Sequence, residues 1–570
     1  MRGVIALAAV LAALVLGADS GSGAARATHA SVTVYPSGTT FTAKGAAPPH
    51  PATSVSLAMP IGAVDDAVIL ARGAQQVSAL TTSIDPPLQL QLLFAHYVSV
   101  ERKLVPDVLE PWDGAGRSTE ETNQPIWVQV TVPQGTAPGT YSGSVSVVAD
   151  GAQTVVPVSV HVADVTIPPP GQVSGSLLTA FSVSPQSYGN EVHRLHGISA
   201  KQSLPGLFAF LASYRLSPND WGYASPDSKS GYTTSGDWFH DKAARMIEAV
   251  GEPRQFAAMR IPMSNNRATP HKWIAGVSPY RPKTWCPYLE AVKGFWESHG
   301  WLPGAYPYLW GMDEPGPRLE KIVRRQAAAA HACWPGSHVV ITGEPQPFNR
   351  YLWNGGADDV DVWAILESRY YGEFTDPRPY REGERRATMF LRSIDAARKR
   401  GKQIWTYTYE SRAHQTPGLA AVEPASNSRM FVEWAALEDI TGLLRGNGMT
   451  SYDPHSNPLR TNNEGGGDYI LIYPGRDAPI PSARLEELRE GIEDWEILDI
   501  VREKHGSRAV VKLLSHLFST TATGAKLACF LGCPIKNSLP YSWPLFSHDA
   551  TTATKIAAMR AKALAAASSQ

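Results

Sequence analysis

The sequence predicts a multidomain protein: an N-terminal β-sandwich, a (β/α)8 barrel of the TIM type and a C-terminal helical extension. Three observations support this prediction. Residues 31–167 form short runs of alternating apolar and polar residues, with turn residues between them. Apolar runs and helical stretches then follow one another to about residue 478, and the remainder is largely helix-forming. These three patterns are typical of a β-sandwich, a (β/α)8 barrel and a helical segment, respectively.

The N-terminal segment, residues 1–27, reads MRGVIALAAVLAALVLGADSGSGAARA. A basic residue precedes an apolar run of roughly fifteen residues and then small residues, which is typical of a secretory signal peptide. A membrane anchor, which needs about twenty apolar residues, is the alternative. No later stretch is apolar enough to span a bilayer. We therefore expect a secreted or cell-surface protein without a membrane span in the mature chain.

The next segment, residues 28–170, is the predicted β-sandwich. The run IWVQVTVP places Ile126, Val128, Val130 and Val132 on one face of a strand, and YSGSVSVV and VVPVSVHV repeat this alternation. Alternation with period two indicates strands that bury one face. The proline run IPPPGQ that follows predicts a stiff linker.

Residues 171–478 are the predicted barrel. Eight candidate strands are LLTAFSV, a short segment at 215–218, AAMRIPM, AYPYLWGM, HVVITG, VDVWAIL, QIWTYTY and GMTSYD. Helical stretches separate most of them, which is the pattern of a (β/α)8 barrel. An open doubly wound sheet is the alternative, but no GxGxxG motif follows the first strand.

Residues 479–570 form the predicted helical region. Pro481 and Ser482 indicate a helix start, and the run RLEELREGIEDWEIL that follows has apolar residues at helical spacing. We expect this helix to pack on the barrel. Its charged residues, Arg484 and Arg489 among them, are expected to form ion pairs on the helix surface.

Charge and composition exclude several function classes. The 570 residues carry a formal net charge of -1 without long basic runs, which argues against a nucleic-acid partner. The motifs GxSxG, HExxH and GxxxxGK[ST] are absent. His193 and His196 lie three residues apart but lack a third ligand nearby, so we expect no metal. No organic cofactor is implied either.

The four cysteines are compatible with export, because disulfides form in oxidising compartments. Cys529 and Cys533 lie four residues apart, and Cys286 and Cys333 form a second possible pair if their helices are neighbours. Disulfides or free thiols are both open, and the sequence does not decide their connectivity.

The stretch WGMDEP, residues 310–315, places two adjacent acids at the end of the fourth candidate strand. Active sites of such barrels lie at the carboxyl ends of the strands. Burial beside Trp310 would raise the pKa of one acid, which suits a general acid in glycosidic bond cleavage. We therefore take Asp313 and Glu314 as the catalytic candidates. A turn in which Asp, Pro and Gly cluster is the alternative.

Aromatic and acidic residues at other strand ends complete a candidate sugar site. Substrate-binding candidates are Trp310, Trp363, Trp405, Tyr407, Glu410 and Tyr452. Aromatic faces pack on the C–H faces of sugars, and Tyr407 could also donate a hydrogen bond. Glu410 could instead pair with Glu314 as a nucleophile. The alternatives are that half or more of the aromatic residues belong to the barrel core and that Glu410 is an exposed loop acid.

Several stretches together resemble one family, the glycoside hydrolase family 123-like catalytic domain (domain of unknown function 4091) with its N-terminal β-sandwich. They are LVPDVLEPWDG, NQPIWVQVTVPQGTAPGTYSGSVSV, WGMDEP, YILIYPG and RLEELREGIEDWEILDI. The resemblance runs from about residue 100 to 500. This sequence departs from the family at MTSYDP, where relatives commonly have a Tyr-Trp pair.

The resemblance implies a secreted, exo-acting β-N-acetylhexosaminidase of the N-acetylgalactosaminide type, acting on a glycan or glycoconjugate. In that family the substrate's own acetamido oxygen is the nucleophile. Carried onto this sequence, Glu314 is the general acid/base, Asp313 orients the acetamido group, and Tyr407 holds its carbonyl. The alternatives are a retaining glycosidase of non-acetamido sugars using Glu314 and Glu410, or a non-catalytic carbohydrate-binding protein.

Overall fold

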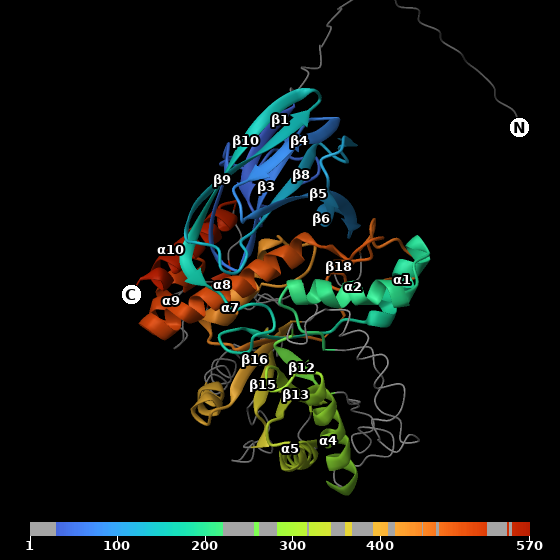
Figure 1. Cartoon of the computed structure of the whole chain (residues 1–570), viewed down its shortest axis with the longest axis vertical. Helices are drawn as coiled ribbons and strands as arrows, with labels where there is room; N and C mark the ends of the chain where they lie inside the picture. Colours follow the sequence, from blue (N-terminus) through green and yellow to red (C-terminus); the bar gives the residue numbers. More distant parts are fainter. Residues whose placement is uncertain are drawn as a thin grey trace, which may run out of the picture.

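The computed structural model describes residues 30–219, 256–261, 282–315, 319–343, 359–367, 392–408, 417–446, 448–462, 467–520, 544–546 and 550–569. Strands at the N-terminus lie at one end of the molecule, parallel strands at the other, and a group of helices between them (Figure 1). Cys529, Cys533 and Glu410 lie outside the described residues.

The N-terminal strand domain consists of two five-stranded sheets. The first has the order β1 (Ser31–Pro36), β3 (Val64–Arg72), β8 (Asn123–Thr131), β5 (Gln89–Val100) and β6 (Lys103–Trp112), all antiparallel. The second has the order β2 (Val55–Ile61), β10 (Ala152–Thr166), β9 (Gly139–Ala149), β4 (Gln76–Ile84) and β7 (Arg117–Ser118), with only the β2–β10 pair parallel.

One hydrophobic core receives side chains from both sheets. Ile126, Val128 and Val130 of β8 are fully buried in it, together with Val145 and Val147 of β9. The predicted inward face of β8 is thus confirmed. Its opposite face is also covered, because Trp127 packs in a second cluster that includes Ala483, which lies far along the chain.

The second strand-rich part is a nearly closed parallel barrel. Its seven strands have the order β11 (Leu178–Phe181), β17 (Gly442–Arg445), β16 (Gln403–Thr408), β15 (Val362–Leu366), β14 (His338–Thr342), β13 (Tyr306–Asp313) and β12 (Ala258–Arg260). Five of them lie within the predicted strand segments, and β13 extends one residue beyond its segment. Their order follows the chain, as it does where each strand is added beside the preceding one.

The predicted second strand at 215–218 lies between β11 and β12, although it makes only an isolated bridge. The Phe181 amide donates to the Ser217 carbonyl at 2.9 Å, and the Asn219 amide donates to the Phe181 carbonyl at 2.7 Å. Toward β12, the Ala258 amide donates to the Ser217 hydroxyl at 3.2 Å. This segment bridges the gap that the seven-stranded sheet leaves.

The predicted last barrel strand was wrong. We expected residues 448–453, whereas the strand beside β11 is β17, Gly442–Arg445. Residues 450 and 470 instead form an isolated antiparallel bridge beyond the end of that strand. The run GLLR directly continues the apolar pattern of the preceding helix, so its strand character is not visible in the sequence.

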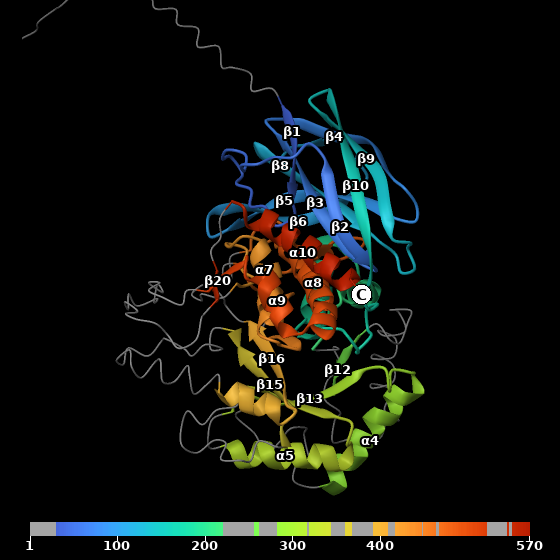
Figure 2. The same ribbon diagram turned by 90° about the vertical axis from the view of Figure 1, so that its left-hand side faces the viewer.

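The helices are α1 (Pro185–His196), α2 (Ala200–Ser213), α4 (Pro282–Ser298), α5 (Glu320–Cys333), α7 (Ser426–Leu437), α8 (Ala483–His505), α9 (Ser507–Leu514) and α10 (Thr552–Ser568). Two short hairpins, β18 (Ile472–Tyr473) with β19 (Ile480–Pro481) and β20 (Phe518–Thr520) with β21 (Pro544–Phe546), complete the described elements. Both views place α7, α8, α9 and α10 between the N-terminal strand domain and the barrel strands (Figures 1 and 2).

Helix α8 begins where the sequence predicts. The Ser482 hydroxyl accepts a hydrogen bond from the Leu485 amide at 3.1 Å and caps the helix. At Gly491 the helix touches α7, since a Cβ there would lie 3.0 Å from the Cα of Arg429. Glycine therefore allows the close approach of the two helices.

The prediction that the charged residues of α8 lie on its surface was wrong. Arg484, Arg489, Glu490 and Glu493 are all at most 4% exposed. The helix is covered on several sides, by α7, by α10 and by strands of the N-terminal strand domain. Its charged side chains therefore pair with groups on those elements instead of with water.

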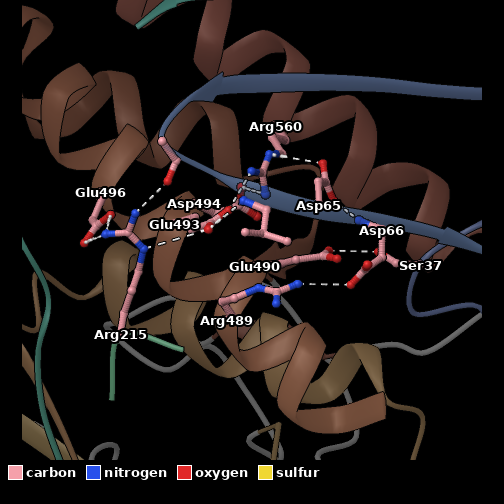
Figure 3. A network of polar contacts seen from close by, with 12 residues as sticks. Ser37, Asp65, Asp66, Arg215, Arg489, Glu490, Glu493, Asp494, Glu496 and Arg560 are labelled. Carbon is pink, nitrogen blue, oxygen red and sulfur yellow. Dashed lines mark hydrogen bonds and ion pairs between the residues drawn. The ribbon is translucent and has the colours of Figure 1, made fainter. Parts of the chain in front are cut away.

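These side chains belong to an interdomain charge network, shown in part in Figure 3. Its members are Asp65, Asp66, Arg215, Arg429, Glu433, Glu486, Glu487, Arg489, Glu490, Glu493, Asp494, Glu496 and Arg560. Arg215, beside β11, reaches Glu496 of α8 at 3.1 Å and donates to the Gly62 carbonyl at 3.0 Å. The network thus connects barrel, helices and N-terminal strand domain.

A disulfide joins Cys286 of α4 to Cys333 of α5. The two helices are neighbours on the outside of the barrel, as the possible pairing required. Closing a loop of 47 residues restricts the unfolded chain and stabilises the fold by about 2–4 kcal/mol. In the described part of the chain, no helix combines the length and the apolar character of a membrane span.

Candidate active site

The site begins at the carboxyl end of β13, where the strand contains a β-bulge. Trp310 pairs with Val340 of β14, but Met312 pairs with the next residue, Ile341, so Gly311 is the extra residue. A bulge reverses which side chains point to each face of the sheet. As a result Asp313, and not its neighbour, lies opposite Thr342 at the end of β14.

Thr342 connects both acids of the pair. Its hydroxyl donates to Asp313 Oδ1 at 2.9 Å and accepts a hydrogen bond from the Glu314 amide at 2.8 Å. Glu314 has a φ of 38°, a conformation uncommon for residues other than glycine. The sharp change of direction at Glu314 sends the two adjacent side chains to different partners.

Tyr407 completes the described site from the other side of the barrel. It lies on β16, and its hydroxyl donates to Glu314 Oε1 at 2.6 Å. The tyrosine side chain is buried, with 6% of the residue exposed. Strands β13, β14 and β16 therefore position the two carboxylates, and each carboxylate accepts a hydrogen bond from one hydroxyl group.

Comparison with known proteins gives the family. The model of the glycoside hydrolase 123 catalytic domain matches residues 246–501, and the model of the glycoside hydrolase 123 N-terminal domain matches residues 95–149. The catalytic match contains Asp313, Glu314, Thr342 and Tyr407. The chain contains the catalytic and N-terminal domains of glycoside hydrolase family 123. It is an enzyme that cleaves glycosidic bonds.

One solved structure agrees with this fold, and a second is reported for comparison. A family 123 glycoside hydrolase from Clostridium perfringens, studied for glycolipid glycan hydrolysis, has a TM-score of 0.60 at 14% identity, covering 94% of this chain and 98% of that one. An endo-β-1,4-mannanase from Thermotoga petrophila has a TM-score of 0.35 at 11% identity, covering 56% and 77%. No curated protein matches the sequence.

In this family 123 enzyme, Tyr407 packs against an aromatic cluster inside the barrel. The Trp405 ring packs against Tyr308, with ring centroids 5.8 Å apart, and against Tyr306 at 6.0 Å. Trp405 is fully buried, and its indole nitrogen donates to Gln403 Oε1 at 3.1 Å. We expected Trp405 to contact substrate; the structure corrects this, because the ring fills the barrel interior below Tyr407.

Two further expected sugar contacts pack in the core or against it. Trp363, 1% exposed, points to the opposite face of β15, where its cluster includes Ile341 and Ile404 of the neighbouring strands. Tyr452 lies beyond the end of β17 and donates to the Ile472 carbonyl at 2.8 Å. The prediction for Trp363 is corrected on this ground, because its buried side chain faces the helices. The half-buried Tyr452 supports the loop before α8, and its contact with substrate stays a prediction.

The remaining candidates are placed only in part. Trp310 lies on β13 just before the bulge, and its backbone alone is described. Glu410 lies outside the described residues, two positions beyond β16. Their roles in binding substrate stay predictions.

Glu367, which follows β15, is a carboxylate with a strongly shifted pKa. Burial raises its pKa to about 8, and the Thr408 hydroxyl lies 3.4 Å from its Oε1. A shifted pKa in a cleft marks a catalytic candidate. Glu367 is fully buried, however, beside the equally buried pair of Arg445 and Asp468, so we interpret it as part of the structural core of the strand ends.

Sequence reasoning missed the bulge and Thr342. The signal for the first was a glycine inside a strand pattern, which often marks a bulge. The signal for the second was a polar residue at the end of HVVITG, the strand that follows the acidic pair along the chain. Adjacent parallel strands bring their carboxyl ends to one edge, so these residues could have been grouped.

Proposed function

We propose that this enzyme is an exported, exo-acting β-N-acetylhexosaminidase of the N-acetylgalactosaminide type that retains the anomeric configuration. The Clostridium perfringens relative was studied for glycolipid glycan hydrolysis, which supports a glycoconjugate substrate for this chain. The signal-like segment at residues 1–27 supports secretion or display at the cell surface.

The proposal rests on one observation: two adjacent carboxylates at the barrel mouth are held by separate hydroxyl groups. Tyr407 donates to Glu314 and Thr342 donates to Asp313, at 2.6 and 2.9 Å. A retaining glycosidase with its own nucleophile places its two carboxylates about 5–5.5 Å apart on either side of the glycosidic bond. An adjacent pair is better suited to a substrate that provides the nucleophile itself.

Glu314 is the general acid and base of the proposed reaction. Its protonated carboxyl group gives a proton to the glycosidic oxygen as the bond from that oxygen to the anomeric carbon breaks. The bond from Tyr407 fixes Oε1 as an acceptor, which favours Oε2 as the oxygen that carries the proton. The carboxylate then takes a proton from the water that attacks in the second step.

Asp313 acts on the acetamido group of the sugar. Its carboxylate accepts the N–H of that group, so the carbonyl oxygen becomes more nucleophilic and attacks the anomeric carbon. A cyclic oxazoline or oxazolinium intermediate forms, and water opens it with net retention. Preorganised charge that meets a developing cation is the main source of stabilisation in such a step. The contact of Tyr407 with the acetamido carbonyl stays a prediction, since its hydroxyl donates to Glu314.

We also propose the finer architecture. The two five-stranded sheets support a β-sandwich. The segment at 215–218 occupies the position of the second strand, which supports a distorted (β/α)8 barrel of the TIM type. The domain boundaries, at 28–170, 171–478 and 479–570, stay predictions. Helix α8, assigned by us to the third region, lies largely within the catalytic-domain match, which ends at residue 501.

Release of p-nitrophenol from a panel of aryl glycosides tests the function. The panel contains the β-N-acetylgalactosaminide, the β-N-acetylglucosaminide, the β-galactoside, the β-glucoside and α-linked controls. We expect turnover of the 2-acetamido sugars alone, with a loss of about 100-fold or more in Glu314→Gln, because general acid catalysis contributes 10²–10⁴-fold. Circular dichroism controls for folding of the variant.

Other outcomes of the panel separate the alternatives. Turnover restricted to sugars without an acetamido group would contradict substrate assistance and favour Glu410 as nucleophile, which recovery of an inactive Glu410→Gln by azide would support. Glycan binding without turnover over long incubation would indicate a carbohydrate-binding protein.

A further inference from the structure

Thr342 is the residue through which the barrel controls the geometry of the acidic pair. It is 1% exposed, at the last position of β14, and directly opposite Asp313 in the strand register. A threonine hydroxyl has one proton to donate and lone pairs to accept. Here it donates to Asp313 Oδ1 and accepts from the Glu314 amide. A single side chain thus bonds to both members of the pair.

The two bonds reinforce one another. A hydroxyl that accepts a hydrogen bond becomes a better donor, so the Glu314 amide strengthens the bond to Asp313. A carboxylate oxygen held in a fixed orientation is what an acetamido N–H requires as an acceptor.

The backbone at Glu314 depends on the same hydroxyl. A φ of 38° is unfavourable for a residue with a Cβ and persists where the surroundings fix it. The bond from the Glu314 amide to Thr342 is one such constraint, and the contact of its side chain with Tyr407 is another. Thr342 therefore acts on the acid at 314 through the backbone and on the acid at 313 through the side chain.

We propose that Thr342 is a positioning residue for the hydrolysis, which fixes Asp313 toward the acetamido group and holds the turn that presents Glu314. This inference rests on the proposed function. Thr342 is expected to affect the chemical step more than substrate affinity, because it acts through Asp313.

The test compares variants of Thr342 on the aryl N-acetyl-β-hexosaminide that the wild-type enzyme cleaves best. Thr342→Val replaces the hydroxyl by a methyl group of similar size. We expect kcat to fall about 10- to 100-fold with KM little changed, since the half-buried Asp313 carboxylate loses a hydrogen-bond donor. Thr342→Ser keeps the hydroxyl and should retain activity near the wild-type level.

A matched control is Thr406→Val, which removes another buried threonine hydroxyl, one that donates to the Ile365 carbonyl at 2.9 Å. It should leave kcat near the wild-type value. If Thr342→Val does not fold, the comparison of Thr342→Ser with Thr342→Ala isolates the hydroxyl instead.

A double-mutant cycle with Asp313→Asn tests whether Thr342 affects kcat through Asp313. If Thr342 acts mainly through Asp313, replacing it in the Asp313→Asn background should cost much less than in the wild type. Full activity in folded Thr342→Val, equal losses in the Ser and Val variants, or additive losses in the cycle would each overturn the inference. An inactive wild-type enzyme across all acetamido sugars would instead contradict the proposed function.

Discussion

Asp313 and Glu314 are neighbours in the chain, yet the fold gives each its own hydrogen-bond donor. Two adjacent carboxylates repel one another. The bulge at Gly311 and the positive φ at Glu314 turn the side chains toward Thr342 and Tyr407. At the scale of residues, each of the two carboxylates is therefore held by its own hydrogen-bond donor.

The sequence predicts those residues of the site whose position shows in a local pattern, and it does not predict the others. The acidic pair was visible because it ends a strand pattern with a proline, and Tyr407 because a phenol near the end of a strand pattern could donate a hydrogen bond. Trp363 was assigned to the site although alternation places it on the helix-facing side. Thr342 was not visible as a partner, because its role depends on the one-residue shift of register at the bulge.

At the scale of elements, the short strand β17 supports the site from below. Its first residue, Gly442, lies beside Trp405, and a Cβ there would approach the indole ring to 2.4 Å. No local sequence pattern indicates this contact, since Gly442 and Trp405 meet only after β16 and β17 have paired. The pairing explains why a glycine begins the strand.

We predict that Gly442→Ala destabilises the enzyme by about 1–3 kcal/mol, because extra volume in a packed core forces side chains or backbone to move. Displacement of Trp405 should also lower activity, since Tyr407 lies two residues further along the same strand. The measurement is urea unfolding followed by tryptophan fluorescence.

Gly446→Ala is the matched control for this strand. A Cβ at Gly446 would have no heavy atom within 4 Å, so we expect its stability to stay within about 0.5 kcal/mol of the wild type. Equal stability of the Gly442 and Gly446 variants would contradict the packing that we describe around Trp405.

At the scale of the whole molecule, the interdomain charge network joins the two strand-rich parts. Nine carboxyl groups and four guanidinium groups make it up among the described residues. Twelve of these residues are buried, and the side chain of the thirteenth, Arg215, is 6% exposed. Burial raises the pKa of Glu487 to about 7 and that of Glu496 to about 8, and it also raises the pKa values of Asp66, Glu433 and Glu490. Some of these groups therefore keep their protons near neutral pH.

The raised pKa values predict the direction of the pH dependence. Between pH 4.5 and about 8, the unfolded chain has lost these protons while the folded network keeps them, so stability falls as the pH rises. His96 acts in the same direction: burial alone would lower its pKa, but hydrogen bonds with Glu110 and Glu120 raise it to about 9. We expect the melting temperature to fall by a few degrees from pH 5.5 to 8.5.

Calorimetry at a series of pH values measures this effect. Glu487→Gln, which keeps a neutral group of similar shape, should weaken the dependence on pH. Glu503→Gln, at an exposed position of the same helix, is the control and should leave it unchanged. A melting temperature that rises through this pH range would contradict the protonated state of the network.

The network also shows what the sequence could not predict at this scale. The pattern of α8 has an apolar stripe and charged remainder, which normally indicates one solvated face. Its charges are buried because Asp65 and Asp66, more than 400 residues earlier in the chain, and Arg560 of α10 pack onto that face. Partners so distant in sequence leave no mark on the local pattern.

The central claim is that the substrate's acetamido oxygen attacks the anomeric carbon. The most direct test measures kcat/KM on p-nitrophenyl N-acetyl-β-galactosaminide and on its mono-, di- and trifluoroacetyl analogues. Fluorine withdraws electrons from the acetamido oxygen and weakens it as a nucleophile. The account predicts a steep decrease in rate with each added fluorine, whereas equal rates across the series would contradict substrate assistance and point to an enzymic nucleophile.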